Sequence, residues 1–275
     1  MVTHSQFNTD ILCRAMGVST SGFYHWRSRP KETSIEDQQL LDKLIRLFDE
    51  SQGTYGVKRL TDDLRDLGEV INHKRVARVK RENGLYPKQN KYFVVTTDST
   101  HGKPVAENHL NRQFKVSEPN TVWVSDITYI PYRHGMLYLS IILDLHSRKV
   151  IGWQLANHMK AELVIEAIDR AIVRRGCLPK LFHSDRGSQY VSERVANKLQ
   201  GVTISMSRKG NCWDNAVAES FFGTLKSEHT NFENYETMDQ ARASLFNYIE
   251  GFYNRRRKHS ALNYLSPDDF EKLAG

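Results

Sequence analysis

Three strand-like segments, followed by alternating helix-like and strand-like segments, constrain the fold of this chain more than any other feature. The expected strands are apolar and β-branched runs, at 122–130, 136–143, 150–156, 181–182 and 202–206. The expected helices have helical periodicity, at 161–175, 192–199 and 215–228. This order predicts an α/β domain over 119–230, with a mixed sheet flanked by helices.

Three acidic residues stand where such a fold can bring them together. Asp126 and Asp185 each end an apolar run, and Glu219 lies in a helix-like stretch. Converging carboxylates cannot all stay ionised without a counter-charge, and hard divalent cations such as Mg²⁺ supply it. A pair of metal ions can activate a nucleophile and stabilise the leaving oxygen in phosphodiester displacement. We therefore expect an Mg²⁺-dependent enzyme that cuts or joins nucleic acid.

The composition fits a globular protein with a polyanionic partner. Of the 275 residues, 39% are hydrophobic and 26% are charged, which is ordinary for one or two soluble domains. The net charge of +7 favours nucleic acid, although many basic proteins merely stay soluble this way. No apolar run approaches the ~18 residues of a membrane span. With only three scattered cysteines and no signal-peptide pattern, we expect a cytoplasmic protein with no membrane association.

The N-terminal part is predicted to be helical. Residues 1–30 form a small helical segment, which either packs or contacts DNA. Residues 34–84 read as three helices of a helix-turn-helix-like domain, and 85–118 as a linker or extended arm. The third helix has a basic side, which predicts DNA contact as in a recognition helix, with a solvated surface as the alternative. The candidate contacts there are Lys74, Arg75, Arg78 and Arg81.

The C-terminal segment, 237–275, is expected to be mostly helical and carries the densest basic cluster of the chain. An aromatic stretch with helical spacing precedes the cluster. The cluster is either a solvated helix end or a second DNA contact. Its members are Arg255, Arg256, Arg257, Lys258 and His259.

Several neighbours compete with the three acids. Asp144 also ends a strand, and its alternative is a structural, hydrogen-bonded acid. Asp214 is expected to cap the helix that carries Glu219. Glu228 lies nine residues beyond Glu219 and should face the opposite side of that helix, at ~100° per residue. Lys226 shares the side of Glu219 and is expected to bind phosphate, unless it is merely solvated.

Three further residues near the acids have two interpretations each. Asn215 can orient substrate or the Glu219 carboxylate. His183 can tune Asp185 or simply pack within its strand. Trp213 belongs either to the core or to a base-stacking surface.

Motifs in fixed order along nearly the whole chain resemble the retroviral-integrase-like transposases. The acids lie in Trp-Val-Ser-Asp-Ile-Thr-Tyr-Ile (123–130), His-Ser-Asp-Arg-Gly-Ser-Gln-Tyr (183–190) and Gly-Asn-Cys-Trp-Asp-Asn-Ala-Val-Ala-Glu-Ser-Phe-Phe (210–222). The stretch Tyr-Asn-Arg-Arg-Arg-Lys-His-Ser-Ala-Leu-Asn-Tyr-Leu-Ser-Pro (253–267) resembles the C-terminal signature. The chain is most similar to the OrfB-type transposases of insertion sequence family three, which carry a DDE catalytic core.

This resemblance implies a ribonuclease-H-like fold and DNA transposition. Asp126, Asp185 and Glu219 would hold two Mg²⁺ ions, with Mn²⁺ as a substitute. The implied partners are double-stranded DNA at the element ends and at the target, further copies of the chain, and the upstream-frame OrfA product. The implied chemistry is cleavage of the element ends followed by strand transfer from the freed 3′-hydroxyl.

One spacing departs from the family pattern. Asp185 and Glu219 are separated by 33 residues, two fewer than usual, and the shortfall lies near Gln200 and Gly201. A short surface loop at that point is usually tolerated. The alternatives that stay open are a DNA-binding protein from a catalytically impaired copy, and a nuclease that only hydrolyses DNA.

Overall fold

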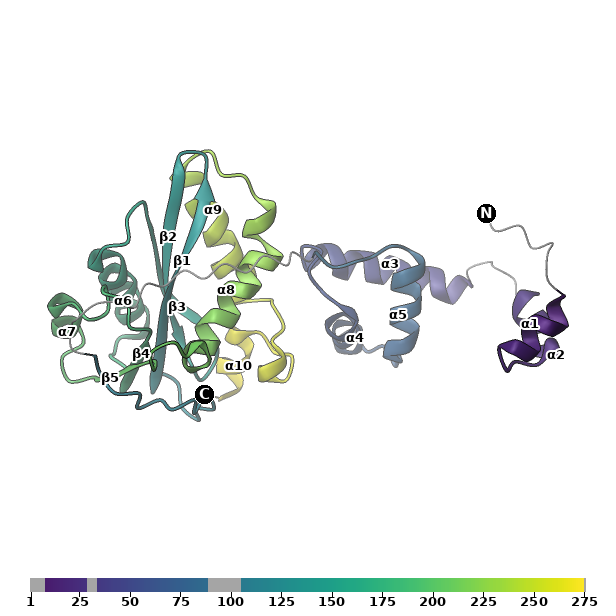
Figure 1. Ribbon diagram of the computed structural model, residues 1–275, viewed down its shortest axis with the longest axis horizontal. Coiled ribbons are helices and arrows are strands. Elements are labelled where there is room, and N and C mark those ends of the chain that lie inside the picture. Colours follow the sequence, from purple (N-terminus) through teal and green to yellow (C-terminus); the bar gives the residue numbers. More distant parts are fainter. Residues whose placement is uncertain (1–7, 29–33, 89–104, 275) are drawn as a thin grey trace.

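The structure, a computed structural model, describes residues 8–28, 34–88 and 105–274. Its largest part is a five-stranded mixed sheet with helices on both faces, preceded along the chain by smaller groups of helices (Figure 1). The expected mixed sheet flanked by helices is thus confirmed. No helix in the described part of the chain is long and apolar enough to cross a membrane.

The sheet combines an antiparallel meander with two parallel strands. Its order is β3-β2-β1-β4-β5, so the chain leaves the β3 edge and returns to the other side of β1. β1 pairs antiparallel with β2 and parallel with β4. The strands are β1 (Val122–Tyr132), β2 (Gly135–Asp144), β3 (Val150–Ala156), β4 (Leu181–Ser184) and β5 (Thr203–Met206).

Side chains alternate between two cores, one on each face of the sheet. Trp123 points into a core beneath α6 (Ala161–Arg175) and α7 (Glu193–Lys198). Its neighbours Val122 and Val124 point to the other core, which α8 (Ala216–Glu228) and α9 (Met238–Phe246) cover. Figure 1 shows these helix pairs on opposite sides of the strands. Because the start of β1 is covered on both faces, its first three residues, Val122 to Val124, are all apolar.

The predicted C-terminal helix is interrupted. α9 ends at Phe246, and the chain continues as a π-helical stretch, Asn247–Tyr253, before the final helix α10 (Pro267–Ala274). A π-turn shifts the following side chains around the helix axis, so Tyr248, Ile249 and Phe252 all reach the core. Apolar spacing alone could not distinguish this from a regular helix.

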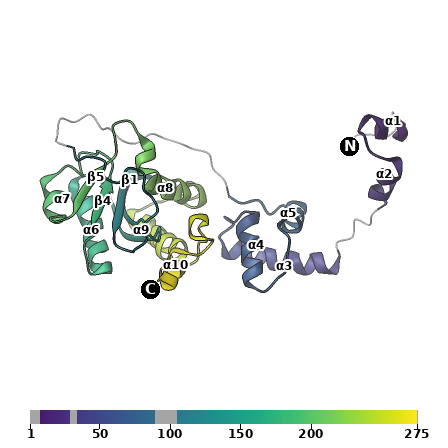
Figure 2. The same cartoon turned by 90° about the horizontal axis from the view of Figure 1, so that it is seen from below.

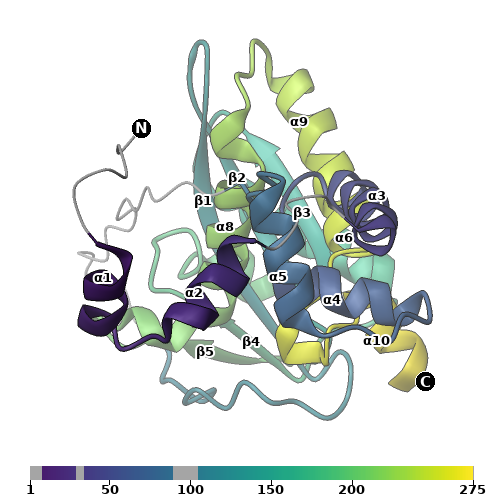
Figure 3. The same ribbon diagram turned by 90° about the vertical axis from the view of Figure 1, so that its right-hand side faces the viewer.

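The N-terminal described helices begin at side-chain caps. α1 (Thr9–Ala15) starts after Asn8 and α2 (Thr20–Arg27) after Ser19, and each cap accepts a hydrogen bond from a first-turn amide. The helical segment predicted within residues 1–30 is thus two short capped helices in its described part. In Figure 3 these two helices lie in front of the rest of the molecule.

A three-helix unit follows, made of α3 (Ile35–Glu50), α4 (Val57–Asp66) and α5 (His73–Glu82). The three helices contact one another, and their apolar sides meet around Leu44 and Leu60, both fully buried. Asn72 caps α5, since its side chain accepts a hydrogen bond from the Lys74 amide. The predicted helices of this region are confirmed to within a few residues.

The three-helix unit touches the C-terminal segment of the larger domain. The Tyr55 hydroxyl donates to the Arg256 carbonyl at 3.1 Å and accepts from the Lys258 amide at 2.7 Å. Lys258 Nζ lies 2.5 Å from an oxygen of Asp62 and 3.0 Å from one of Asp63. Figure 2 shows α4 on the side of the unit that faces the C-terminal part.

Candidate active site

Asp126 lies within β1 and not at its end, because β1 continues to Tyr132 along β2. Asp126 ends the apolar run of this strand, whereas the strand itself was predicted to continue to residue 130 and extends to Tyr132. The neighbouring parallel strand, β4, ends at Ser184, which lies beside the residue before Asp126. The parallel register pairs Val124 with His183, so continuing it by two residues sets Asp126 beside Asp185. Since adjacent strands are ~4.8 Å apart, these two carboxylates share one corner of the sheet.

Glu219 reaches the same corner from α8. The helix packs against β1, and Glu219 is in its first turn. Just before the helix, Asn215 Nδ2 donates to the Ser125 carbonyl at 3.2 Å. Ser125 Oγ in turn lies 2.8 Å from the Tyr190 hydroxyl. These buried hydrogen bonds fix the helix start and the loop after Asp185 onto β1.

The pKa shifts of the acids show that the three carboxylates interact electrostatically. Burial raises the pKa of Asp126 well above its usual range, and the charges of Asp185 and Glu219 raise it further. Partial burial and then Asp185 raise the pKa of Glu219, although its side chain remains largely exposed. Like charges held this close favour a cation between them.

The donor chemistry fits a hard divalent cation. Carboxylate oxygens, which β1, the loop after β4 and α8 supply here, are the ligands that Mg²⁺ prefers. Within the ranges 8–28, 34–88 and 105–274, no group of three acidic, histidine or cysteine side chains is arranged so that it could already hold a metal ion.

Lys226 lies on the same side of α8 as Glu219. Its ammonium stands 4.2 Å from the centre of the Tyr129 ring, and Asp126 attracts it. Partial burial lowers the pKa of Lys226. The position fits the expectation of a phosphate-binding cation at the edge of the acid corner.

The competing acids have structural roles. Asp144 is fully buried and accepts from the amides of Asn120 and His146, with Arg175 beside it. Asp214 does not cap α8 as expected. Its carboxylate is buried and accepts from the side chains of Arg208 and Arg112.

His183 and Glu228 also have structural surroundings. His183 is buried between two serine hydroxyls, and burial lowers its pKa to about 4, so it packs as a neutral strand residue. Glu228 faces away from Glu219, as helical geometry predicted, and pairs with Arg257.

Some predicted DNA contacts on α5 are free and others are engaged. Lys74 and Arg81 are exposed. Arg75 and Arg78 each pair with Asp37, at 2.9 and 2.6 Å, yet remain partly open to solvent. Part of the basic side of α5 thus holds the three-helix unit together.

The C-terminal basic cluster divides in the same way. Arg255 and Arg256 are exposed, whereas Arg257 is buried against Glu228 and Lys258 is held by acids of α4. His259 is partly buried and caps a short turn through Nδ1. Arg257 and Lys258 therefore form ion pairs within the protein, and a DNA phosphate would have to displace these acidic partners to bind them.

The shortened spacing between Asp185 and Glu219 is absorbed in a tight turn. α7 ends at Lys198 and β5 begins at Thr203, with Gly201 in the left-handed region at φ +84°. β5 still pairs in register with β4. β5, the strand that precedes the Glu219 helix along the chain, therefore keeps its place in the sheet although the spacing is two residues shorter.

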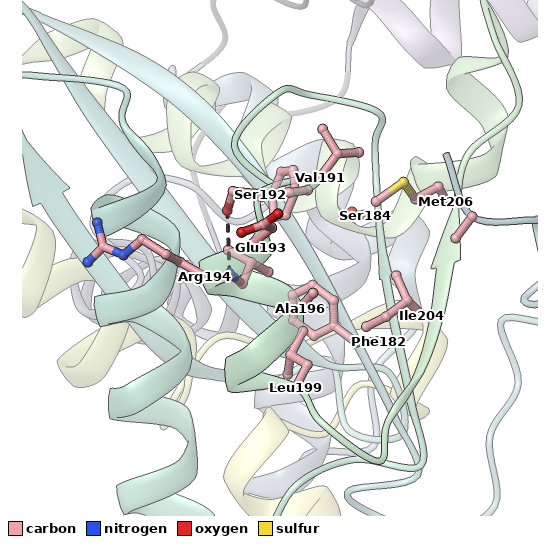
Figure 4. A pocket seen from close by; sticks show the side chains of 13 residues that line it. Phe182, Ser184, Val191, Ser192, Glu193, Arg194, Ala196, Leu199, Ile204 and Met206 are labelled. Atoms are coloured by element: carbon pink, nitrogen blue, oxygen red, sulfur yellow. Dashed lines mark hydrogen bonds between the residues drawn. The ribbon is translucent and has the colours of Figure 1, made fainter. Parts of the chain in front are cut away.

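A largely apolar cavity of about 660 Å³ lies next to this corner but contains none of the three acids. It opens between α7, β4 and β5, with Phe182, Ile204 and Met206 on one side and Ser192 at the start of α7 on the other (Figure 4). The mostly apolar lining of this cavity differs in chemical character from the three carboxylates.

Comparisons with known proteins agree with the domains described. Residues 116–212 and 200–267 match families described as "Integrase core domain", and 35–93 match an "HTH-like domain". The matches and the sheet order confirm the expected ribonuclease-H-like, integrase-type core with a helix-turn-helix-like domain before it.

Similar proteins of known name extend over most of the chain. The transposase InsF for insertion sequence IS3A of Escherichia coli (strain K12) is 41% identical over 274 residues, covering 97% of this chain and 95% of that protein. The transposase for insertion sequence element IS904 of Lactococcus lactis is 40% identical over 247 residues, covering 89% and 98%.

Similar solved structures come from retroviruses. The simian T-cell lymphotropic virus intasome has a TM-score of 0.48 at 15% identity, covering 82% of this chain and 73% of that chain. The HTLV-2 integrase catalytic core domain in complex with magnesium has a TM-score of 0.43 at 16% identity, covering 55% and 96%.

Proposed function

The chain belongs to the IS3-family transposases, which are DDE-type polynucleotidyl transferases with an integrase core. On this basis we propose that it cuts insertion-sequence ends with Mg²⁺ and joins the freed 3′-hydroxyl end to another DNA strand. The observation that carries this proposal is the shared corner of Asp126, Asp185 and Glu219. The charges of Asp185 and Glu219 raise the pKa of Asp126, and the charge of Asp185 raises the pKa of Glu219, as expected where a cation would be favourable.

The three carboxylates would hold the metal, and a pair of ions suits their combined charge. When bound, such ions activate the attacking water or 3′-hydroxyl and stabilise the departing 3′-oxygen. Lys226 would bind a phosphate oxygen beside Asp126 and orient the strand. Asn215 and Ser125 would keep the helix and the strand that carry the acids at a fixed separation. Mn²⁺ has similar ligand preferences and would substitute for Mg²⁺.

Double-stranded DNA would lie across the acid corner and the helix-turn-helix-like domain. Among the predicted contacts, Lys74 and Arg81 on α5 and Arg255 and Arg256 in the C-terminal segment are exposed and would bind phosphates. Arg75, Arg78 and His259 would contribute only if their internal partners are exchanged. Joining two ends needs more than one active site, so we propose self-association on DNA, with the upstream-frame OrfA product as a further partner.

The test is cleavage of labelled terminal inverted-repeat DNA with Mg²⁺, comparing the wild type with Glu219→Gln. We expect the variant to bind DNA normally and to lose at least about 100-fold in cleavage rate, because one metal ligand is gone. Glu233→Gln removes the same charge from an exposed position outside the site and serves as the matched control.

A catalytically impaired copy remains the second candidate, and the short spacing between Asp185 and Glu219 is the observation behind it. It requires that the wild type bind end DNA but cut it no faster than Glu219→Gln. Full activity of the wild type would exclude that candidate.

A further inference from the structure

An exposed tryptophan stands beside the acid corner. Trp213 leaves 68% of its surface open to solvent, whereas Trp123 and Trp153 of the same domain are buried. The sequence left a core position and a surface position equally open for Trp213, and the structure assigns the surface. A single exposed ring is common on protein surfaces, so a function for Trp213 has to follow from how its turn is held and from its place beside the acids.

The turn that carries Trp213 is held rigidly from one side. Asp214, the next residue, is fully buried, and its carboxylate accepts from Arg208 Nε and from Arg112 Nε, both at 2.8 Å. The Asn108 side chain donates to the same carboxylate at 2.9 Å. These charge-assisted hydrogen bonds fix the 3₁₀ turn Cys212–Asn215 without using the indole.

The other side of the turn is fixed to the catalytic strand. Asn215 donates to the carbonyl of Ser125, the residue before Asp126. The same turn leads directly into α8, whose first turn carries Glu219. Six residues of helical backbone span roughly 9–12 Å, which is the scale of a few nucleotides. Trp213 is therefore held near Asp126 and Glu219 by a turn whose position is fixed on both sides.

We propose that Trp213 stacks on a DNA base next to the attacked phosphate and holds that base out of its pair. This inference rests on the proposed function and adds a substrate-positioning residue to it. A paired duplex end restricts access of its backbone to a recessed carboxylate corner, and unpairing a base frees the strand to bend toward it. An aromatic face compensates the unstacked base with little regard to its identity. The exposed Lys209 nearby suits the accompanying phosphates.

The experiment uses two terminal inverted-repeat duplexes, one fully paired and one mismatched beside the scissile phosphate. On the paired probe, Trp213→Ala should cut about 5- to 150-fold more slowly, the range expected for one lost base–aromatic stack. Trp213→Phe should recover much of the rate. On the mismatched probe, Trp213→Ala should approach the wild type, because the base is already unpaired. Phe246→Ala, at another exposed aromatic residue of the same domain, is the matched control.

A second readout does not depend on cleavage. With 2-aminopurine beside the scissile phosphate and Glu219→Gln as the background, binding should change the fluorescence, and adding Trp213→Ala should abolish the change. If Trp213→Ala loses the same factor in cleavage rate on both probes, the proposal is overturned. It is also overturned if the fluorescence change on binding is the same with and without Trp213→Ala. If Trp213→Ala leaves the fluorescence change unaltered but makes the assembled protein–DNA complex smaller, Trp213 instead contacts another copy of the protein. If the wild type cuts neither probe, the proposed function fails, while the fluorescence still decides the role of Trp213.

Discussion

Glu228 and Arg257 form an ion pair that is closed off from solvent. Arg257 donates through Nε and Nη2 to both Glu228 oxygens, at 2.7 and 2.6 Å, and the Tyr248 hydroxyl donates to the same carboxylate at 3.0 Å. The acid and the guanidinium come from α8 and from the chain after the π-helical stretch. The pair therefore ties the helix that carries Glu219 to the C-terminal segment.

We predict that Glu228→Gln destabilises the protein by about 3–5 kcal/mol, because it leaves a buried guanidinium without its counter-charge. Glu236→Gln provides the contrast, since Glu236 pairs with Arg133 on the surface and its loss should remove no more than about 1 kcal/mol. Urea unfolding measures both. Equal midpoints for the two variants would contradict a buried role for the Glu228 pair.

His259 makes stability depend on pH. Burial, and then the charges of Arg257, Arg148 and Arg59, lower its pKa to about 4 from the ordinary 6.5. The unfolded chain therefore takes up the proton first on acidification. Stability from this group is present above about pH 6.5 and is lost as the pH falls toward 4, by at most about 3 kcal/mol.

His259→Asn, which can keep the capping acceptor, should flatten that part of the stability profile. Chemical denaturation of both proteins from pH 7 to 4 measures the difference. A loss of stability in this window that is the same in the variant would show that other groups cause it.

Residues differ in how far the sequence could predict them. Asp126 and Asp185 follow apolar runs, so their convergence could be anticipated from strand pairing. Lys258 could not be read in the same way, because its partners Asp62 and Asp63 lie nearly 200 residues earlier. A run of basic residues has the same appearance whether it meets DNA or an internal acid.

Among the elements, β3 and α6 approach each other unusually closely. Their contact is at Gly152, where a β-carbon would lie 2.8 Å from the Ala171 amide nitrogen and closer still to the Ala167 carbonyl oxygen. Both neighbours are helix backbone and cannot rotate away. The glycine therefore sets the distance between the sheet and the helix that covers it.

Gly152→Ala should cost about 2–3 kcal/mol through overpacking against α6. Gly223 of α8 is the matched control, because a β-carbon there meets nothing within 4 Å. Gly223→Ala should raise stability by up to about 1 kcal/mol, as expected for a helix interior. Thermal unfolding of the two variants decides, and a destabilisation of the same size at both positions would contradict the close-approach argument.

Strongly periodic elements were the predictable ones. The sequence gives β3 and α6 their observed bounds, because β-branched runs and the Gly176 stop are local signals. The extension of β1 to Tyr132 depends on pairing with β2, and the π-helical stretch depends on packing against the sheet. Such tertiary influences leave no local mark, so these boundaries were missed.

At the scale of the whole molecule, charges within the chain hold the helix-turn-helix-like domain and the integrase-type core together. Lys258 bridges to α4, and Arg59 lies 3.6 Å from Glu228, which belongs to the catalytic domain. Lys74 and Arg81 on α5 and Arg255 and Arg256 in the C-terminal segment remain exposed. The arrangement suits a protein in which one DNA molecule spans both parts, as the proposed function requires.

The most direct test of the central claim is strand transfer from a pre-cut element end in Mg²⁺. We predict that an end carrying a 3′-hydroxyl is joined to a second DNA strand, and that the same end carrying a 3′-deoxy terminus is not. Glu219→Gln should abolish the joined product while leaving the complex with DNA intact. Metal-dependent cutting without any joined product would contradict the account and identify a nuclease that only hydrolyses its substrate.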